Sequence, residues 1–306
     1  MAPVAYNWQL THDLDVFLAR AGEFLRSRPA MHTVPLSVTD TLRRRGIHGF
    51  GAGVPVFGFL EREGTVRAAF FRTPPYRLNV TPLSGEEADA LAVRLAEEAH
   101  SPPGVFGDRA TVAAFAEAWQ RRTGATVSQR SRERLYRLHL LTPPEPAPPG
   151  RARVATGADR EELARWQGQF AAAIGEGASR DGGAWADDRI AYGGVTLWET
   201  PDGTPVAMAC VTPLIAGQIR VAPVYTPAPL RGRGYAGAAT AEVSRAALAA
   251  GAEEVLLFTD LANPTSNGLY QRIGYRPVSD FATYDFACDV TATAAPWPNR
   301  SPNDGS

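Results

Sequence analysis

VAPVYTPAPLRGRGYAGAAT, residues 221–240, carries the strongest signal in this chain. An apolar run predicts a strand that ends at Tyr225, a turn with two prolines follows, and small residues predict a helix over 235–250. Glycines before that helix let the backbone approach a ligand closely, and the first helical turn offers unpaired N–H groups at the positive end of the helix dipole. Together with Arg231 and Arg233, this pattern predicts a binding site for an anion such as a pyrophosphate.

The same stretch contains Gly232-x-Gly234-x-x-Gly237, the pattern of a dinucleotide-binding loop. That pattern requires its first glycine almost directly after the strand, whereas TPAPLR separates Tyr225 from Gly232. Too little chain follows the helix to complete a doubly wound dinucleotide sheet. A nicotinamide or flavin enzyme is therefore the weaker interpretation, and a glycine-rich turn that binds nothing is a further alternative.

The composition excludes several classes of enzyme. The chain has 306 residues and a net charge of -1, and all 31 of its basic residues are arginine. Without lysine, the chain lacks the Schiff-base residue of pyridoxal-phosphate enzymes and the phosphate-binding lysine of P-loop proteins and protein kinases. No histidine follows His139, and Cys210 and Cys288 stand far apart, so we expect no metal site and no Ser-His or Cys-His pair in the second half.

The same features bound the partners. The N-terminus lacks the unbroken apolar core of a signal peptide, and no apolar run reaches the length of a membrane span. The balanced charge gives no general attraction to nucleic acid or to an anionic membrane. We therefore expect a cytoplasmic protein with neither of these as a partner.

A proline-rich segment divides the chain. Residues 142–150, TPPEPAPPG, hold five prolines in nine positions and predict an extended linker. We expect one α/β domain over 1–141, a second over 151–286 and a flexible tail over 287–306. The runs 58–74 and 196–213 share a strand, a glutamate, a glycine-containing turn, a second strand and a final Thr-Pro, which suggests that the two halves arose by duplication.

Two motifs in order resemble the GNAT superfamily of N-acetyltransferases. Arg231-x-x-Gly234-x-Ala236 is similar to the family's loop that binds the pyrophosphate of acetyl-CoA. About 30 residues downstream, LFTDLANPTSNGLYQRIGYRP is similar to the family's next segment, with matching positions at Asn263, Asn267 and Tyr270. The resemblance covers roughly residues 151–286 and implies two GNAT-like mixed-sheet domains, the C-terminal one complete and the N-terminal one degenerate.

The resemblance implies direct transfer of an acyl group, usually acetyl, from coenzyme A to a small-molecule or peptide amine. Tyr270 would protonate the departing thiolate, or it could be a core aromatic residue. Asn263 and Asn267 could bind coenzyme or could be capping residues. The residues expected to hold the coenzyme are Val224, Tyr225, Thr226, Arg231, Gly232, Arg233, Gly234, Tyr235, Ala236, Asn263 and Asn267.

The general base is not part of either motif. Glu199 ends a strand expected to border the acceptor cleft and is the candidate, although it could equally be a solvated turn residue; Glu176 and Asp181 are weaker candidates. In the first half, Ser84 and Glu87 predict a capping box at the corresponding helix, whose acidic first turn would repel a pyrophosphate. We expect that half to be a scaffold or one wall of the acceptor pocket. The alternative to an enzyme is a non-catalytic module that binds or senses acyl-CoA.

Overall fold

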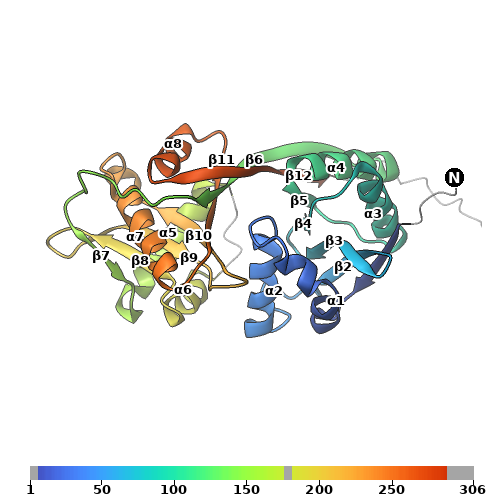
Figure 1. Ribbon diagram of the computed structural model, residues 1–306, viewed down its shortest axis with the longest axis horizontal. Coiled ribbons are helices and arrows are strands. Elements are labelled where there is room, and N and C mark those ends of the chain that lie inside the picture. Colours follow the sequence, from blue (N-terminus) through green and yellow to red (C-terminus); the bar gives the residue numbers. More distant parts are fainter. Residues whose placement is uncertain (1–5, 176–180, 288–306) are drawn as a thin grey trace, which may run out of the picture.

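The computed structural model describes residues 6–175 and 181–287, which form one mixed sheet of 12 strands covered by helices (Figure 1). The predicted tail over 287–306 lies outside these residues except for Ala287, the last residue of the final strand. None of the helices in the described part of the chain is long and apolar enough to cross a membrane. The predicted α/β class with mixed-sheet halves is confirmed.

The two halves repeat one order of elements. The first half contains β1 (Asn7–Thr11), α1 (Leu14–Arg26), α2 (Thr33–Arg45), β2 (Val56–Arg62), β3 (Thr65–Arg72), β4 (Leu78–Val80), α3 (Gly85–Glu97), β5 (Gly104–Asp108), α4 (Arg109–Thr123) and β6 (Thr126–Leu138). The second contains β7 (Arg151–Val154), α5 (Arg160–Ala173), α6 (Gly182–Ala191), β8 (Val195–Glu199), β9 (Pro205–Val211), β10 (Gln218–Tyr225), α7 (Tyr235–Ala249), β11 (Glu254–Asp260), α8 (Pro264–Arg272) and β12 (Tyr275–Ala287). The two runs that suggested a duplication are the equivalent hairpins β2–β3 and β8–β9.

The halves exchange their last strands. The strand order is β1-β2-β3-β4-β5-β12-β6-β11-β10-β9-β8-β7, so β12 pairs with β5 of the first half and β6 pairs with β11 of the second. β6 and β12 then pair with each other over almost their whole length, which joins the two sheets into one. The predicted ranges 1–141 and 151–286 describe the halves along the chain, but each half uses the other's final strand.

Each half is a sheet between two helix pairs. In the second half, α7 and α8 pack on one face around residues such as Tyr136, Val255 and Tyr275, and α5 and α6 cover the other around Trp166 and Met208. In the first half, α3 and α4 cover the first face and α1 and α2 the second. Figure 1 shows α3, α4 and α8 along one side of the long central strands and α1, α2 and α6 on the other. This layering puts the start of α7 beside the end of β10.

Candidate functional site

Helix α7 begins without a side-chain cap. Its N-cap is Gly234, which has a φ of 84°, in the left-handed region that glycine adopts without strain. Within the described residues, the N–H groups from Gly232 to Gly237 donate to no acceptor, and the first amide to bond is that of Ala238, 3.1 Å from the Gly234 carbonyl oxygen. Six consecutive free N–H groups at the positive end of a helix dipole form a binding site for an anion.

The equivalent helix of the first half, α3, is capped by side chains at its N-terminus. The Ser84 hydroxyl accepts from the Glu87 amide at 3.2 Å, and the Glu87 carboxylate accepts from the Ser84 amide at 2.8 Å. This is the predicted capping box, and Glu86 adds a further negative charge in the same turn. The start of α3 therefore offers neither the free donors nor the positive potential of α7.

Two arginines lie in the loop that leads into α7. Arg231 Nε donates to the Thr226 carbonyl at 3.0 Å, and Arg233 Nη2 donates to the Pro229 carbonyl at 3.3 Å. These bonds hold the loop in shape, and neither guanidinium forms an ion pair with any described residue. Both positive charges thus remain available beside the free N–H groups.

Strands β10 and β11 separate next to this loop. They pair in parallel from Gln218 with Glu254 to Val221 with Leu257, and no pairing is present beyond that point although both strands continue. Between Val221 and Val224 the pairing of β10 with β9 also shifts register, at the position of Pro223, as is typical of a proline inside a strand. The separation leaves an opening between two strands at the edge where α7 starts.

The end of β10 carries a polar group without a partner. Val224 and Tyr225 pair with Ala209 and Met208 of β9, and Thr226 follows directly. The Thr226 hydroxyl is buried and makes no hydrogen bond in the described structure. An unsatisfied buried hydroxyl is costly, so it marks a position where a ligand would supply the missing partner.

Tyr270 of α8 is buried with its hydroxyl unpaired. The residue is 8% exposed, its ring packs edge to face on that of Tyr275 at 6.1 Å between centroids, and no hydrogen bond to its hydroxyl is present among the described residues. Tyr275, by contrast, is bonded to the Ser244 hydroxyl at 2.7 Å. Burial raises the pKa of Tyr270 to about 12. The phenol therefore stays protonated at neutral pH and has a proton to donate.

Comparison with known proteins agrees with this geometry. Residues 161–275 match the model of the Acetyltransferase (GNAT) family. The C-terminal half belongs to the GNAT family. No curated protein sequence matches the chain.

Solved structures extend the likeness of fold to the whole chain. A GNAT-family acetyltransferase from Colwellia psychrerythraea matches with a TM-score of 0.58 and 12% identity, covering 92% of this chain and 99% of that one. A GCN5-related N-acetyltransferase from Sphaerobacter thermophilus matches with a TM-score of 0.57 and 19% identity, over 90% and 94%. A tandem GNAT protein from the clavulanic acid biosynthesis pathway matches with a TM-score of 0.55 and 13% identity, over 92% and 98%. At these identities the matches show that both halves share the GNAT fold.

The two asparagines of the second motif form hydrogen bonds that hold α8 in place. Asn263 caps α8, its side-chain oxygen accepting from the Ser266 amide at 3.0 Å. Asn267 Nδ2 donates to the carbonyls of Asp260 and Asn263 at 2.7 and 2.8 Å, and its Oδ1 accepts from the Tyr136 hydroxyl at 2.9 Å. These bonds join α8 to β11 and to the exchanged strand β6. The whole Asn267 amide and the Asn263 side-chain oxygen are thus engaged within this half, and the coenzyme site proposed below does not use them.

The geometry around Glu199 argues against its prediction as general base. Glu199 is 4% exposed, and its two oxygens accept from Arg151 Nε at 2.7 Å and Arg153 Nε at 2.6 Å. The Arg151 and Arg153 guanidiniums hold the pKa of Glu199 below its usual range. A base needs contact with the substrate and a pKa near the working pH, whereas Glu199 is buried, paired with two arginines and has a lowered pKa. Of the weaker candidates, Asp181 caps α6, and Glu176 lies outside the described residues.

Two prolines of the 142–150 segment lie beside the start of α7, which the sequence did not predict. Pro148 and Pro144 contact the first turn of α7 at Gly234 and Gly237, and both are half-buried while most of the segment is exposed. Proline-rich composition predicted an extended chain but gave no sign of what that chain touches. Glycines three residues apart at a helix start were the one available signal of a close approach.

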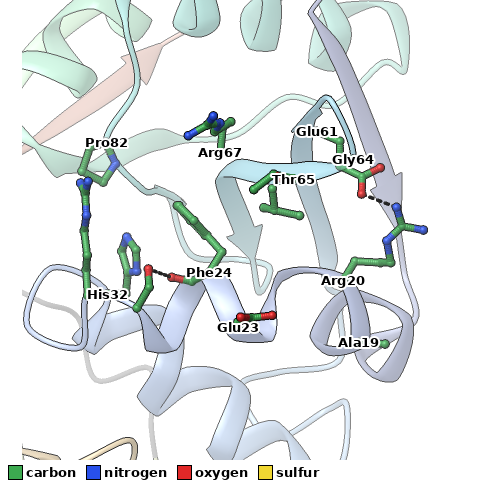
Figure 2. A pocket seen from close by; sticks show the side chains of 13 residues that line it. Ala19, Arg20, Glu23, Phe24, His32, Glu61, Gly64, Thr65, Arg67 and Pro82 are labelled. Carbon is green, nitrogen blue, oxygen red and sulfur yellow. Dashed lines mark hydrogen bonds and ion pairs between the residues drawn. The ribbon is translucent and has the colours of Figure 1, made fainter.

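The first half has a cavity of about 750 Å³ that is separate from this site. It lies between α1 and the β2–β3 hairpin, below Pro82, with Phe24 and Arg67 on its walls and Arg20 paired to Glu61 at one end (Figure 2). Its volume is in the range of small-molecule sites. The described residues contain no group of His, Cys, Asp or Glu side chains that could hold a metal ion.

Proposed function

We propose that this protein transfers an acyl group, in the first place acetyl, from coenzyme A to an amine, with the active site in the GNAT half. The observation that carries the proposal is the run of free N–H groups from Gly232 to Gly237, next to the opening between β10 and β11. The free N–H groups suit the pyrophosphate of coenzyme A, and the opening between the strands suits the narrow arm that extends from that pyrophosphate. Membership of the GNAT family supports the same reading.

The coenzyme would be held mainly by backbone groups. The pyrophosphate would accept from the N–H groups of residues 232–236, with Arg231 and Arg233 adding charge. The amide-bearing arm would lie along β10 past Val221, where β11 no longer pairs with it. There the Thr226 hydroxyl, buried without a partner, would gain a hydrogen bond. Backbone N–H groups from Val224 to Thr226 would polarise the thioester carbonyl.

The chemical step needs a proton for the leaving sulfur. The amine nitrogen attacks the carbonyl carbon, the C–S bond breaks, and the thiolate takes a proton as the amide forms; the nitrogen releases one proton to water, and water returns a proton to the acid that protonated the thiolate. Tyr270 supplies that proton in our proposal, since its hydroxyl is unpaired and protonated. Transfer between groups is efficient when their pKa values match, and a desolvated thiol can reach that of Tyr270.

The test combines binding and turnover. Titration calorimetry with acetyl-CoA measures affinity, and a thiol-release assay with free amino acids, small amines and short peptides measures transfer. We expect the protein to bind acetyl-CoA and to release thiol only when one class of amine is present. Acetyl-CoA binding without thiol release across the panel would favour the non-catalytic module. No binding of acetyl-CoA, or binding of a nicotinamide dinucleotide in its place, would overturn the proposal.

A further inference from the structure

The segment 142–150 runs along the first turn of α7. A Cβ atom placed on Gly234 would lie 3.7 Å from Cβ and Cγ of Pro148, which is ordinary van der Waals contact. A Cβ atom placed on Gly237 would lie 3.4 Å from Cγ of Pro144. The two prolines, four residues apart, thus face two glycines three residues apart on the helix. These glycines belong to the run of free N–H groups.

Both ends of the segment are fixed to the GNAT half. At its start, the Thr142 amide donates to the Ile273 carbonyl at 3.1 Å. At its end, Trp198 Nε1 donates to the Pro149 carbonyl at 3.2 Å. Gly150 then passes so close to the Glu199 carbonyl that a Cβ would be 2.0 Å from its oxygen. A chain that is bonded at both ends and rests on prolines between them is a fixed part of the surface.

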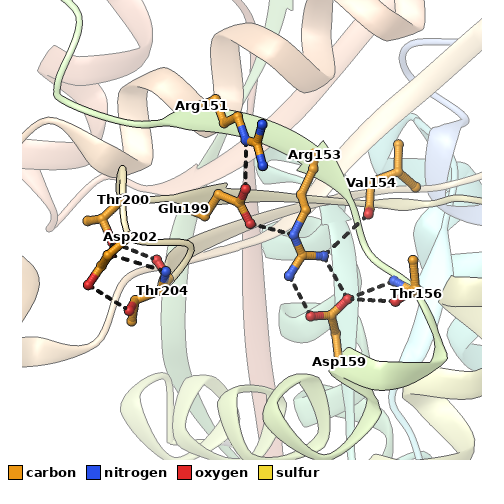
Figure 3. Close-up of polar contacts among 9 residues, drawn as sticks. All are labelled: Arg151, Arg153, Val154, Thr156, Asp159, Glu199, Thr200, Asp202 and Thr204. Carbon is orange, nitrogen blue, oxygen red and sulfur yellow. Dashed lines mark hydrogen bonds and ion pairs between the residues drawn. The ribbon is translucent and has the colours of Figure 1, made fainter.

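An ion-pair cluster around the buried Glu199 carboxylate holds the residues directly after the segment; Arg153 is half-buried and Arg151 is exposed (Figure 3). Glu199 accepts from Arg151 and Arg153, and Arg153 also donates to both oxygens of Asp159 at 2.7 and 2.8 Å. Arg151 follows Gly150, so the bond to Glu199 fixes the end of the segment next to Pro148. Glu199 itself is buried and Arg153 is half-buried, so neutralising Glu199 would leave Arg153 with Asp159 as its remaining ion-pair partner here and would release the exposed Arg151. Glu199 is therefore suited to a structural role at this place.

We propose that segment 142–150 is a wall of the coenzyme site, with Pro144 and Pro148 as positioning residues and Glu199 fixing the wall through Arg151. This inference rests on the proposed function, because it takes the start of α7 as the pyrophosphate site. A ligand on the N–H groups around Gly234 borders Pro148, since that ring already contacts Gly234. The wall removes water from one side of the anion and so strengthens its interaction with the helix dipole. Proline rings keep the wall ordered before the ligand arrives.

The first test is the double variant Pro144→Ser/Pro148→Ser, measured by titration with coenzyme A. A wall that has to be ordered on binding costs affinity, and proline rings reduce that cost, so the double variant should weaken coenzyme affinity by about fourfold to thirtyfold. Pro143→Ser is the matched control, because Pro143 is exposed in the same segment. Circular dichroism shows whether the variants keep the fold. Wild-type affinity in a folded double variant would overturn the inference, whereas a wild-type protein that fails to bind coenzyme A would overturn the proposed function instead.

The second test separates the two roles considered for Glu199. In Glu199→Gln the wall loosens, so KM for acetyl-CoA should rise about fivefold or more while kcat changes little and the pH–rate profile keeps its shape. Loss of a base would instead lower kcat and remove the acidic limb of the profile. Arg151→Gln, which releases the same contact from the other side, should reproduce the rise in KM. A fall in kcat with unchanged KM in Glu199→Gln would overturn the positioning role.

Discussion

Replacement of Gly234 by Asp or Asn tests the anion site with a matched pair. Gly234 has a φ of 84°, and space is open around its missing side chain except for Pro148 at 3.7 Å. Aspartate and asparagine have nearly the same shape, and both tolerate the left-handed region better than other residues do. Each variant should therefore lose up to about 1 kcal/mol of stability from backbone strain. They differ in one negative charge.

The charge difference gives the expected magnitude. A carboxylate about 5 Å from each of two phosphate charges costs about 0.8 kcal/mol per charge if the dielectric constant is that of water, or about 1.7 kcal/mol in all. Because Gly234 is exposed, we use the dielectric constant of water, which gives the smallest expected loss of binding free energy. It corresponds to about a fifteenfold weaker affinity for coenzyme A in Gly234→Asp than in Gly234→Asn.

Calorimetry at low salt and at high salt is the assay, with melting temperatures measured alongside. The Asp and Asn variants should melt within a few degrees of each other, and added salt should narrow the gap in affinity. Equal affinities of the two variants for coenzyme A at low salt would refute the placing of the pyrophosphate on this turn. Ser84→Ala, at the equivalent helix of the first half, should cost about 1 kcal/mol of stability and leave coenzyme affinity unchanged.

Three further predictions follow from the same structure. Tyr270→Phe should lower thiol release about 10²–10⁴-fold with little change in acetyl-CoA affinity. The pKa of Tyr270 is about 12 in the folded protein and lower in the unfolded chain, so the wild type should lose folding stability between pH 10 and pH 12. Chemical denaturation across that range should show a smaller loss of stability in the variant. Full turnover in that variant would end the acid assignment. Thr226→Val should raise the melting temperature, because it removes an unpaired buried hydroxyl. The same variant should bind acetyl-CoA about threefold to tenfold more weakly. Unchanged affinity in calorimetry would exclude a hydrogen bond from Thr226 to the ligand. A fragment of residues 151–287 should not fold as a soluble monomer, because β11 and β12 lose β6 from between them; a dispersed amide spectrum of the fragment alone would contradict this.

Local patterns in the sequence were sufficient for several elements. The Ser84–Glu87 capping box is present where its two residues predicted it. The glycines and prolines before α7 predicted both the loop and the bulge at Pro223. Each of these depends on residues a few positions apart, so the sequence alone was enough to identify them.

The exchanged strand β6 could be predicted only in part. The apolar residues Leu135, Tyr136 and Leu138 indicate a strand only near the end of this stretch, whereas β6 runs from Thr126 to Leu138. Its first eight residues, TVSQRSRE, are mostly polar on both faces and carry no period-2 signal. They form a strand because β12 pairs with them, and that partner lies about 150 residues away in the chain. Local propensity contains no information about such a pairing.

The candidate site divides in the same way. The sequence alone determined the class of protein, the uncapped glycine-rich start of α7, the closed start of α3 and the position of Tyr270, because each follows from residue types at short fixed spacings. Only the tertiary structure decided that Glu199 is held by Arg151 and Arg153, that Asn267 bonds to Tyr136 of β6, and that Pro148 lies on Gly234. The physical reason is that a charge, an amide or a ring acquires its role from its neighbours in space. In this chain the two halves supply those neighbours to each other across an exchanged pair of strands.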